Sequence, residues 1–564
     1  MELSFFDKFY SILKKHIELF TILGLAIIFY FVFFHNIGTY PLMDVDETRY
    51  VAMARDMFNT KDFMTLYLNG EYFFEKPPLY FWHECIAFGL FGKINEFSAR
   101  FPVSLLGFLL SFIIYFFFRK NIGRKFGVIT SLILATSLEF IILAKYAILD
   151  IVLTFYICIA LISYFETFFC RENNKKYFWW LFYLFSGFAV MAKGIPGIAI
   201  PFGIVFFVSI FAKRFKENFK LIYLLPGIGI FLLVVLPWHI IMLKKYDPLF
   251  FNEYIIKHHL HRFINSENNE IGRKQPFYYY FLTVLWGFFP WILSLIAVII
   301  DKIKNLKKFV FADYIKNINF ENLNNREKIM ICALISTVWI LLFFSLSSTK
   351  LVTYILPVYF PLAIIGGNIW YEYINNNKYE KSINIITMII SYIFVFAGIA
   401  AIFSPLYLPQ QLYNDILNVK WLVIISLIIF GVGNILFIKN KKYLFVFLLN
   451  VLFMTVISAF GTGEFFKIDY KFGQQDLIEF AQYAKKHNYT ISAFEMGRKY
   501  SLLYYNGKKI DYNTDQDLTI EGVSEDLNKN NNVVIIRNKQ MDIIEGKVDF
   551  NIIKTGRRYT MIKK

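Results

Sequence analysis

Long apolar runs recur along most of the chain, and short polar segments separate them. The first, "LFTILGLAIIFYFVFF", covers Leu19–Phe34. A membrane-spanning helix needs about 20 mostly apolar residues, and runs of that kind predict about thirteen spans. We place them near residues 18–35, 99–118, 126–143, 148–168, 178–193, 195–212, 221–242, 279–300, 329–346, 353–371, 383–403, 420–438 and 443–460. The sequence therefore predicts a polytopic, all-α membrane domain over residues 1–460.

The polar segments fall into two groups when successive spans cross the membrane in alternate directions. One side receives clusters of Lys and Arg, and such a basic excess is typical of cytoplasmic loops. These basic loops are 119–125, 171–176, 213–220, 301–308 and 439–442. The N-terminus is then predicted to be cytoplasmic. The first outer loop, residues 36–98, and the C-terminal segment are predicted to lie on the opposite side.

Residues 461–564 carry a different pattern, in which the apolar residues come in short pieces. Residues 476–487 have helical periodicity. Residues 489–495 and 531–538 resemble strands, and residues 551–563 resemble a β-hairpin. We therefore predict a small α/β domain of about 100 residues outside the membrane, in which no catalytic motif is evident.

Composition supports a membrane protein. Hydrophobic residues make up 57% of the 564 residues and charged residues only 18%, and the mean hydropathy is +0.48. A soluble globular protein carries more charge. The net charge of +17 is explained by the basic loops, so we expect membrane lipids and no nucleic acid as partners. The four cysteines show no metal-ligand spacing and predict no disulfide framework. No small-residue cleavage site follows the first run, which we interpret as a retained span.

The first outer loop begins with the acidic segment "YPLMDVDETRY". The segment that follows it has the pattern of an amphipathic helix lying along the interface. Asp46 and Glu47 would thus be held at the membrane surface, with Arg49 three residues after Asp46 and able to pair with it. A carboxylate held there can act as a general base or as an electrostatic stabiliser. The alternative is a solvated interface loop.

The second charged segment of this loop is "FFEKPPLYFW". Pro77 and Pro78 stiffen the chain and disfavour helix before them, so Glu75 and Lys76 are expected on a rigid elbow. A lysine there is a suitable point charge for a phosphate. A lysine that only snorkels to the bilayer interface is the alternative.

Further charged residues stand at outer span ends. Asp150 either caps a helix or joins Glu75 in binding a divalent cation. Lys193 lies in the turn "MAKGIPG" between two spans. Placing its charge there costs free energy unless an anion lies nearby. Lys350 and Tyr354 stand at the entrance of an outer span, in "SLSSTKLVTYILP", and Lys350 is a candidate for binding the phosphate of the donor.

The segment "KHHLHRF" invites two interpretations. Its histidines, His258, His259 and His261, match no strong zinc signature. We therefore favour Arg262 as a phosphate clamp.

These candidate residues are all predicted on one face of the membrane. An anionic lipid headgroup would satisfy the cations, and a sugar linked to a lipid phosphate is a suitable donor for a transferase at this face. Fixed cations stabilise such a leaving phosphate. If the acceptor is a hydroxyl, an acidic residue would take the proton from that hydroxyl. If the acceptor is a phosphate, the acidic residue would instead orient or stabilise the reacting groups.

As an ordered set, the segments "DETRY", "FFEKPPLYFW", "LD" at 149–150, "MAKGIPG", "HRF", "QPFYYY" and "SLSSTKLVTYILP" resemble the GT-C membrane glycosyltransferases. The resemblance extends to about residue 365. It is nearest to the aminoarabinose transferase (ArnT-type) branch of the glycosyltransferase 39 / protein mannosyltransferase superfamily. It implies a bacterial inner-membrane enzyme with a periplasmic active site, which takes a sugar from undecaprenyl phosphate to lipid A or, in other branches, to protein Ser/Thr.

The resemblance also implies roles for individual residues. Asp46 matches the family's key acidic residue, which Arg49 and Tyr50 support. Glu75 and Asp150 match positions implicated in binding a metal (Zn²⁺, Mn²⁺ or Mg²⁺) or the substrate, and no nucleotide cofactor is expected. The positions that match residues facing the lipid phosphate are Lys76, Lys193, Arg262 and Tyr354.

Three other functions stay open at this point. A protein O-glycosyltransferase would have the same fold. A lipid flippase or transporter would usually carry charges near the membrane midplane, whereas these charges stand at the outer span ends. A structural anchor for the C-terminal domain would leave the loop chemistry without a purpose.

Overall fold

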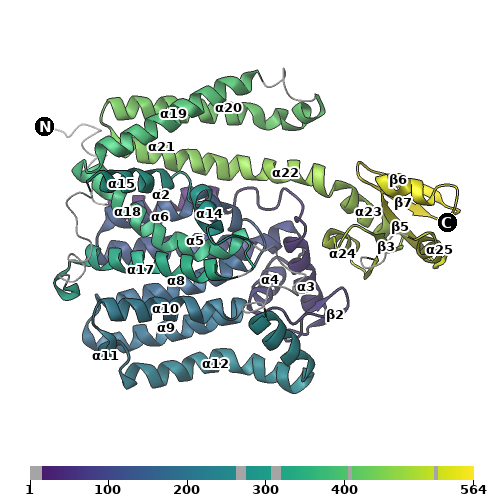
Figure 1. Cartoon of the computed structure of the whole chain (residues 1–564), viewed down its shortest axis with the longest axis horizontal. Helices are drawn as coiled ribbons and strands as arrows, with labels where there is room; N and C mark the ends of the chain where they lie inside the picture. The colour runs from purple at the N-terminus through teal and green to yellow at the C-terminus, as the bar shows by residue number, and fades with distance from the viewer. Residues whose placement is uncertain (1–15, 262–274, 306–318, 348, 404–409, 514–518) are drawn as a thin grey trace.

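A bundle of long apolar helices forms the body of the molecule, and a small α/β domain projects from one end of it (Figure 1). The computed structural model describes residues 16–261, 275–305, 319–347, 349–403, 410–513 and 519–564. The helices of the bundle are α2 (Ile17–Phe33), α5 (Glu96–Asn121), α6 (Arg124–Ala135), α7 (Leu138–Leu143), α8 (Asp150–Glu166), α9 (Glu172–Lys193), α10 (Pro196–Phe211), α11 (Phe215–Asn218), α12 (Leu221–Tyr246), η1 (Phe251–His261), α14 (Tyr279–Gly287), α15 (Ile292–Asn305), η3 (Phe320–Asn322), α17 (Asn325–Leu346), η4 (Val352–Val358), α18 (Tyr359–Asn376), α19 (Glu380–Ile402), α20 (Gln410–Lys439) and α21 (Tyr443–Val456).

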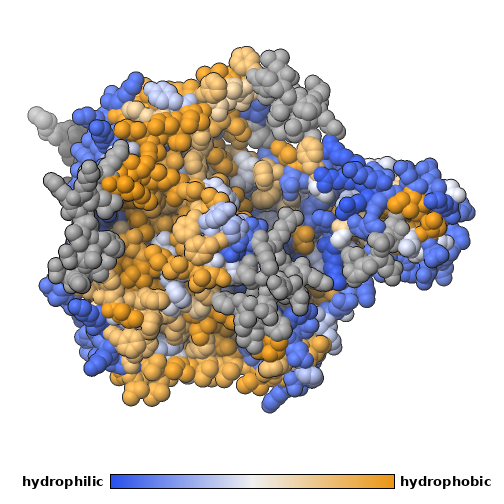
Figure 2. Space-filling model, viewed as in Figure 1, coloured by the Kyte–Doolittle hydropathy of each residue, from blue (hydrophilic) through white to orange (hydrophobic). Residues whose placement is uncertain are grey.

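The chain is a multi-pass membrane protein. In its described residues, seven helices are long and apolar enough to cross a membrane, or eight if α14 and α15 form one broken span. Two shorter apolar helices, α2 and α10, accompany them. On the face seen in Figure 2, hydrophobic side chains form a broad band across the bundle, and hydrophilic side chains gather at its two ends and over the C-terminal domain. This pattern fits a bilayer crossing, but the predicted number of thirteen spans is not confirmed.

Two predicted spans are wrong as single helices. The predicted span 126–143 is divided into α6 and α7 at Thr136–Ser137. The predicted span 279–300 is bent by 117° between α14 and α15. Pro290 lies in that break, and proline removes a backbone donor and clashes with the preceding turn of a helix.

The first outer loop folds against the end of the bundle. It contains α3 (Asp46–Thr60), the two-stranded ribbon of β1 (Tyr67–Leu68) and β2 (Glu71–Tyr72), and α4 (Leu79–Phe91). The predicted helix after the acidic segment is confirmed as α3, and α4 starts directly after Pro78, as proline favours. Helix α3 is mostly buried, with Val51, Met53 and Ala54 fully covered, so it is a packed element rather than one half-exposed to the interface.

The C-terminal domain is built around a five-stranded mixed sheet in the order β4-β3-β5-β7-β6. Strands β4, β3 and β5 run parallel, while β7 is antiparallel to both β5 and β6. Its elements are α23 (Gln475–Lys486), β3 (Thr490–Phe494), α24 (Tyr500–Asn506), β4 (Ile510–Asn513), α25 (Ile520–Asn528), β5 (Asn532–Arg537), η7 (Asn538–Gln540), α26 (Met541–Ile544), β6 (Asn551–Thr555) and β7 (Tyr559–Lys563). The predicted α/β domain is confirmed, because its helix and four strands lie where the patterns placed them.

One continuous helix joins the bundle to this domain. Helix α21 passes through the π-turn η6 (Ile457–Gly461) into α22 (Thr462–Gly473), giving a helix of 31 residues from Tyr443 to Gly473. The predicted boundary at residue 461 therefore falls inside a helix. The sheet domain itself begins after Gly473.

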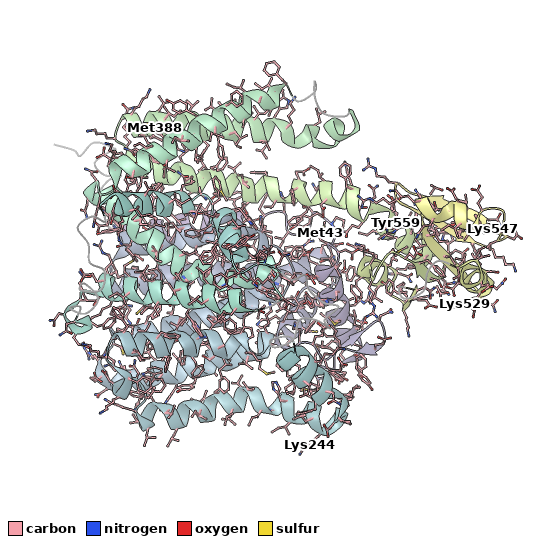
Figure 3. All side chains as sticks on the ribbon, viewed as in Figure 1. Met43, Lys244, Met388, Lys529, Lys547 and Tyr559 are labelled. Atoms are coloured by element: carbon pink, nitrogen blue, oxygen red, sulfur yellow. The ribbon has the colours of Figure 1, made fainter. Side chains whose placement is uncertain are left out.

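Several contacts hold the C-terminal domain against the first outer loop. The Asp44 carboxylate accepts hydrogen bonds from the Ser501 backbone N–H (2.8 Å) and hydroxyl (2.6 Å). The Tyr505 hydroxyl accepts from the backbone N–H of Leu42 at 3.0 Å. Met43 lies at this junction between bundle and sheet domain (Figure 3). The two parts thus meet through specific polar bonds.

Candidate active site

Helix α3 presents an acid and an arginine at its first turn. Arg49 donates from Nη2 to Asp46 Oδ1 at 2.8 Å and to the Tyr50 hydroxyl at 2.9 Å. The Asp46 side chain is 44% exposed, whereas that of Arg49 is only 18% exposed. Arg49 Nε is buried and has no hydrogen-bond partner among the described residues. Asp46 is thus fixed beside a cation and still accessible.

Glu47 lies on the other side of α3, and its predicted catalytic role is not supported. Its side chain is completely buried and forms an ion pair with the equally buried Arg100 at 2.7 Å. Glu47 also accepts from the backbone N–H groups of Met43 (2.9 Å) and Ala147 (2.7 Å). Because neither oxygen faces the cavity described below, Glu47 is a structural residue that holds the loop and the start of α8 in place.

Tyr50 lies at the centre of the charged groups. It is buried and packs edge-on against Tyr80 and Phe81. Burial raises the pKa of the Tyr50 hydroxyl, and the nearby Arg49 opposes that rise. Three carboxylates raise this pKa further: Asp46, Glu75 and Asp150. The structure therefore brings together acids from three separate segments of the chain.

A second cluster adjoins the first at the start of α8. Lys193 forms an ion pair with Asp150, and both side chains are nearly buried. The Lys193 ammonium lies 3.8 Å from the centre of the Tyr354 ring. In the turn "MAKGIPG", Gly197 lies so close to α9 that a Cβ atom at this position would be only 2.3 Å from the backbone of Ala189. Only glycine lets α10 approach α9 so closely, which holds Lys193 opposite Asp150.

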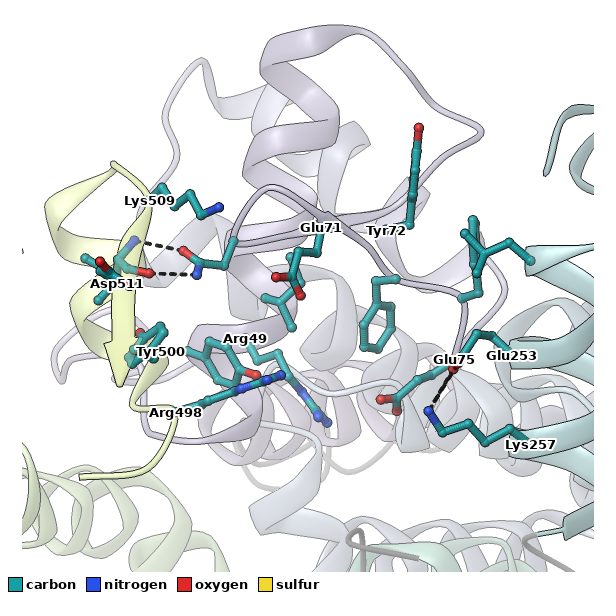
Figure 4. A pocket seen from close by; sticks show the side chains of 17 residues that line it. Arg49, Glu71, Tyr72, Glu75, Glu253, Lys257, Arg498, Tyr500, Lys509 and Asp511 are labelled. Carbon is teal, nitrogen blue, oxygen red and sulfur yellow. Dashed lines mark hydrogen bonds and ion pairs between the residues drawn. The ribbon is translucent and has the colours of Figure 1, made fainter. Parts of the chain in front are cut away.

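A polar cavity of about 620 Å³ opens between the first outer loop, the segment after α12 and the C-terminal domain (Figure 4). Arg49 and Glu75, from the two charged segments of the loop, both line it. The two segments that the sequence singled out therefore do meet. Other side chains that line the cavity are Glu71, Tyr72, Glu253, Lys257, Arg498, Tyr500, Lys509 and Asp511.

Burial opposes the charge on Arg49, yet Tyr50 and Asp46 raise its pKa above the ordinary value. Glu75 raises this pKa further. The guanidinium at the cavity wall is therefore a permanent positive charge, of the kind that binds an oxyanion.

The remaining predicted residues have different positions. Lys76 is half-buried beside Glu75 and does not line the cavity. Lys350 is nearly buried, and its ammonium donates to the carbonyls of Gln275 (3.0 Å) and Ser347 (2.6 Å). Lys350 thus ties two loops together, an arrangement that does not favour the predicted phosphate contact. Arg262 and the side chains of His258, His259 and His261 lie outside the described residues.

Glu75 and Asp150 are the predicted ligands of a divalent cation. No group of three or more His, Cys, Asp or Glu suited to a metal ion occurs in the part of the chain that the structure describes. The Asp150 carboxylate is already neutralised by Lys193. A divalent cation held by Glu75 and Asp150 therefore stays a prediction, and no step is assigned to one.

The C-terminal domain contributes a wall of the cavity, which sequence reasoning missed. Arg498 lies in the turn between β3 and α24, and Tyr500 begins α24. Lys509 and Asp511 stand at the start of β4. Within the sequence they lie more than 400 positions from Arg49, in a segment without a recognisable motif. The mixture of positive and aromatic residues in "GRKYSLLYY" was the one local signal that could have marked them.

Sequence comparison relates this chain to membrane glycosyltransferases. The model of the dolichyl-phosphate-mannose-protein mannosyltransferase family matches residues 18–247. A protein of Aquifex aeolicus without an assigned function is 28% identical over 65% of this chain and 66% of its own length. An undecaprenyl phosphate-alpha-4-amino-4-deoxy-L-arabinose arabinosyl transferase of Wigglesworthia glossinidia brevipalpis is 29% identical over 64% of this chain and 60% of its own length. The chain thus matches less than two thirds of the length of these relatives.

Structural comparison extends over nearly the whole chain. The crystal structure of ArnT from Cupriavidus metallidurans bound to undecaprenyl phosphate superposes with a TM-score of 0.76 at 19% identity, covering 96% of this chain and 97% of that one. Its apo structure gives a TM-score of 0.74 at 18% identity over 97% and 98% of the two chains. At this identity the likeness establishes the fold, including the attached C-terminal domain.

Proposed function

We propose that this chain, which has the fold of the ArnT structures, is an integral membrane glycosyltransferase. Its donor is a sugar carried on a polyprenyl phosphate such as undecaprenyl phosphate, and its acceptor is an envelope molecule, with lipid A as the leading candidate. In this proposal it lies in a bacterial inner membrane, with the N-terminus in the cytoplasm and the cavity and C-terminal domain in the periplasm.

The observation that carries this proposal is the grouping of charges at one end of the bundle. Asp46 and Arg49 stand beside the cavity, and the Asp150–Lys193 pair lies next to them across Tyr50. A lipid phosphate needs cations at the membrane surface, and an acceptor needs an open polar space beside them. The cavity adjoins both the first outer loop and the C-terminal domain, which projects from one end of the bundle (Figure 1).

The proposed reaction breaks the bond between the sugar C1 and the phosphate oxygen of the donor. A new bond forms between C1 and an acceptor oxygen, and the polyprenyl phosphate leaves as an anion. Arg49, at the cavity wall, would stabilise the leaving phosphate, a role that the family resemblance also implies for Lys76. Asp46, which is accessible and held by Arg49, would take the proton of a hydroxyl acceptor. If the acceptor is already ionised, Asp46 would orient it instead.

Protein O-glycosylation is the second candidate function. The match to the protein mannosyltransferase family over residues 18–247 favours it. The arabinosyl transferases among the relatives favour a lipid acceptor. Both reactions would use the same donor chemistry and differ in what enters the cavity.

Mass spectrometry of lipid A and of envelope glycoproteins tests the proposal. Cells would carry the intact gene, its deletion, the Asp46→Asn variant or the control Asp56→Asn. Asp56 lies on the same helix, pairs with Arg55, and does not line the cavity. Loss of a sugar from lipid A in the deletion and in Asp46→Asn, but not in Asp56→Asn, supports a lipid A transferase. Loss from a glycoprotein alone supports the second candidate, and no change in either overturns the transferase function.

A further inference from the structure

Arg498 occupies an unusual place in the cavity. It follows β3 in a short turn in which Gly497 has a φ of +66°, a conformation that favours glycine. This turn directs the exposed Arg498 side chain into the cavity, where it lies close to Arg49 (Figure 4). The proposed transfer chemistry, which stands on residues of the membrane domain, gives Arg498 no role.

The two guanidinium groups share one neighbour. Burial raises the pKa of the Tyr500 hydroxyl, and the positive charges of Arg49 and Arg498, which both lie near that hydroxyl, oppose the rise. In the described part of the chain Arg498 forms no ion pair with a carboxylate, and Arg49 Nε lacks a hydrogen-bond partner. Two cations that converge with unused donors favour an oxyanion between them. The planar fork of arginine matches phosphate oxygens in pairs.

The rest of the cavity suits the sugar part of such a ligand. Tyr72, Phe74 and Tyr512 provide aromatic surface, while the carboxylates of Glu71 and Asp511 provide polar groups for hydroxyls. A volume of about 620 Å³ lies within the usual range for a bound small molecule. Because the walls come from both the first outer loop and the C-terminal domain, the space is complete only when the domain is docked.

We propose that Arg498, together with Tyr500, binds a phosphate ester on the headgroup of a lipid substrate, so that the C-terminal domain forms part of the substrate site. This inference rests on the proposed function and deepens it. The phosphate belongs either to the polyprenyl phosphate of the donor or to a phosphorylated glycolipid acceptor. Both share the chemistry that the two arginines recognise.

Direct binding to the full-length protein in lipid nanodiscs tests the proposal. The probes are undecaprenyl phosphate, phosphorylated lipid A and dephosphorylated lipid A. The variants are Arg498→Ala, Arg498→Lys and the control Arg537→Ala, which removes an exposed arginine of the same domain outside the cavity lining. Hydrogen bonds to charged groups predict a rise in Kd of about 10- to 100-fold for Arg498→Ala.

The expected result is weaker binding of one phosphorylated probe, partial recovery in Arg498→Lys, and no change with dephosphorylated lipid A. Weaker lipid A binding identifies the acceptor as the source of the phosphate, and weaker undecaprenyl phosphate binding identifies the donor. Equal behaviour of Arg498→Ala and Arg537→Ala overturns the proposal, as does an equal loss for the dephosphorylated lipid. Binding needs no turnover, so failure of the transferase assay would remain a separate result.

Discussion

Replacing Arg100 by methionine should lower the free energy of unfolding more than a substitution that removes an exposed charged side chain. All five N–H groups of Arg100 are used: two bonds go to Glu47, and the others go to the carbonyls of Ile37, Tyr40 and Pro41, at 2.7 to 2.9 Å. Both partners of the ion pair have no exposed side-chain area. The substitution Arg100→Met keeps most of the volume but leaves the Glu47 carboxylate buried beside three unpaired carbonyls.

Removing one partner of a buried ion pair costs about 3 to 5 kcal/mol of unfolding free energy. The freed carbonyls add to this cost because unsatisfied buried acceptors are unfavourable. The double variant Glu47→Gln/Arg100→Met removes the unpaired charge. We expect it to recover about 1 to 3 kcal/mol relative to the sum of the single variants.

Equilibrium unfolding in mixed detergent micelles would measure the four proteins of this cycle. The exposed ion pair of Lys554 and Glu479 supplies the control, and Lys554→Met should cost about 1 kcal/mol or less. An Arg100→Met protein within about 1 kcal/mol of the wild type would refute the reasoning, as would additive single substitutions. Folded Arg100→Met protein should also be slower in the proposed sugar transfer, because the same network holds the loop that carries Asp46.

Three further predictions follow from the geometry. Prolonged chelation of divalent cations should leave the proposed sugar transfer unchanged, because the Lys193 ammonium already neutralises the Asp150 carboxylate; activity that falls and returns with added Mg²⁺, Mn²⁺ or Zn²⁺ would contradict this. Asp44→Ala should speed proteolysis after Gly473, since it removes both bonds to Ser501, and unchanged cleavage would argue against this docking role. Burial lowers the pKa of Lys145 to about 7, so the unfolded chain binds a proton there that the folded chain releases; stability should rise from pH 7 to 10, and Lys145→Met should flatten that rise in thermal unfolding.

The elements with strong local patterns could be predicted from the sequence. Strands β3 and β5 are runs of buried apolar residues, and α23 has clear helical periodicity. Strand β4 was missed because only Ile510 of its four residues is buried. Its place in the sheet comes from pairing with β3, which no local pattern reports.

The site divides in the same way. The charged segments around Asp46 and Glu75 stood out because charges are rare at span ends. Asp46 and Glu47 could not be distinguished, since successive residues of a helix point about 100° apart and only the fold shows which one meets Arg100. The contribution of Arg498 depends on how a distant domain docks, and sequence spacing carries no information on that.

The length of the continuous helix from Tyr443 to Gly473 determines how far the sheet domain stands from the membrane. Its 31 residues extend about 46 Å, whereas the hydrocarbon core of a bilayer is about 30 Å thick, so the last turns stand clear of the lipid. The number of residues in this helix sets the distance of the sheet domain from the membrane. It also sets the rotation of the domain about the helix axis. One inserted residue would turn the domain by about 100° and carry its cavity wall away from α3. Inserting two whole turns would restore the orientation of the sheet domain and move its cavity wall about 10 Å farther from the membrane. The cavity of the proposed site would then admit a larger lipid headgroup.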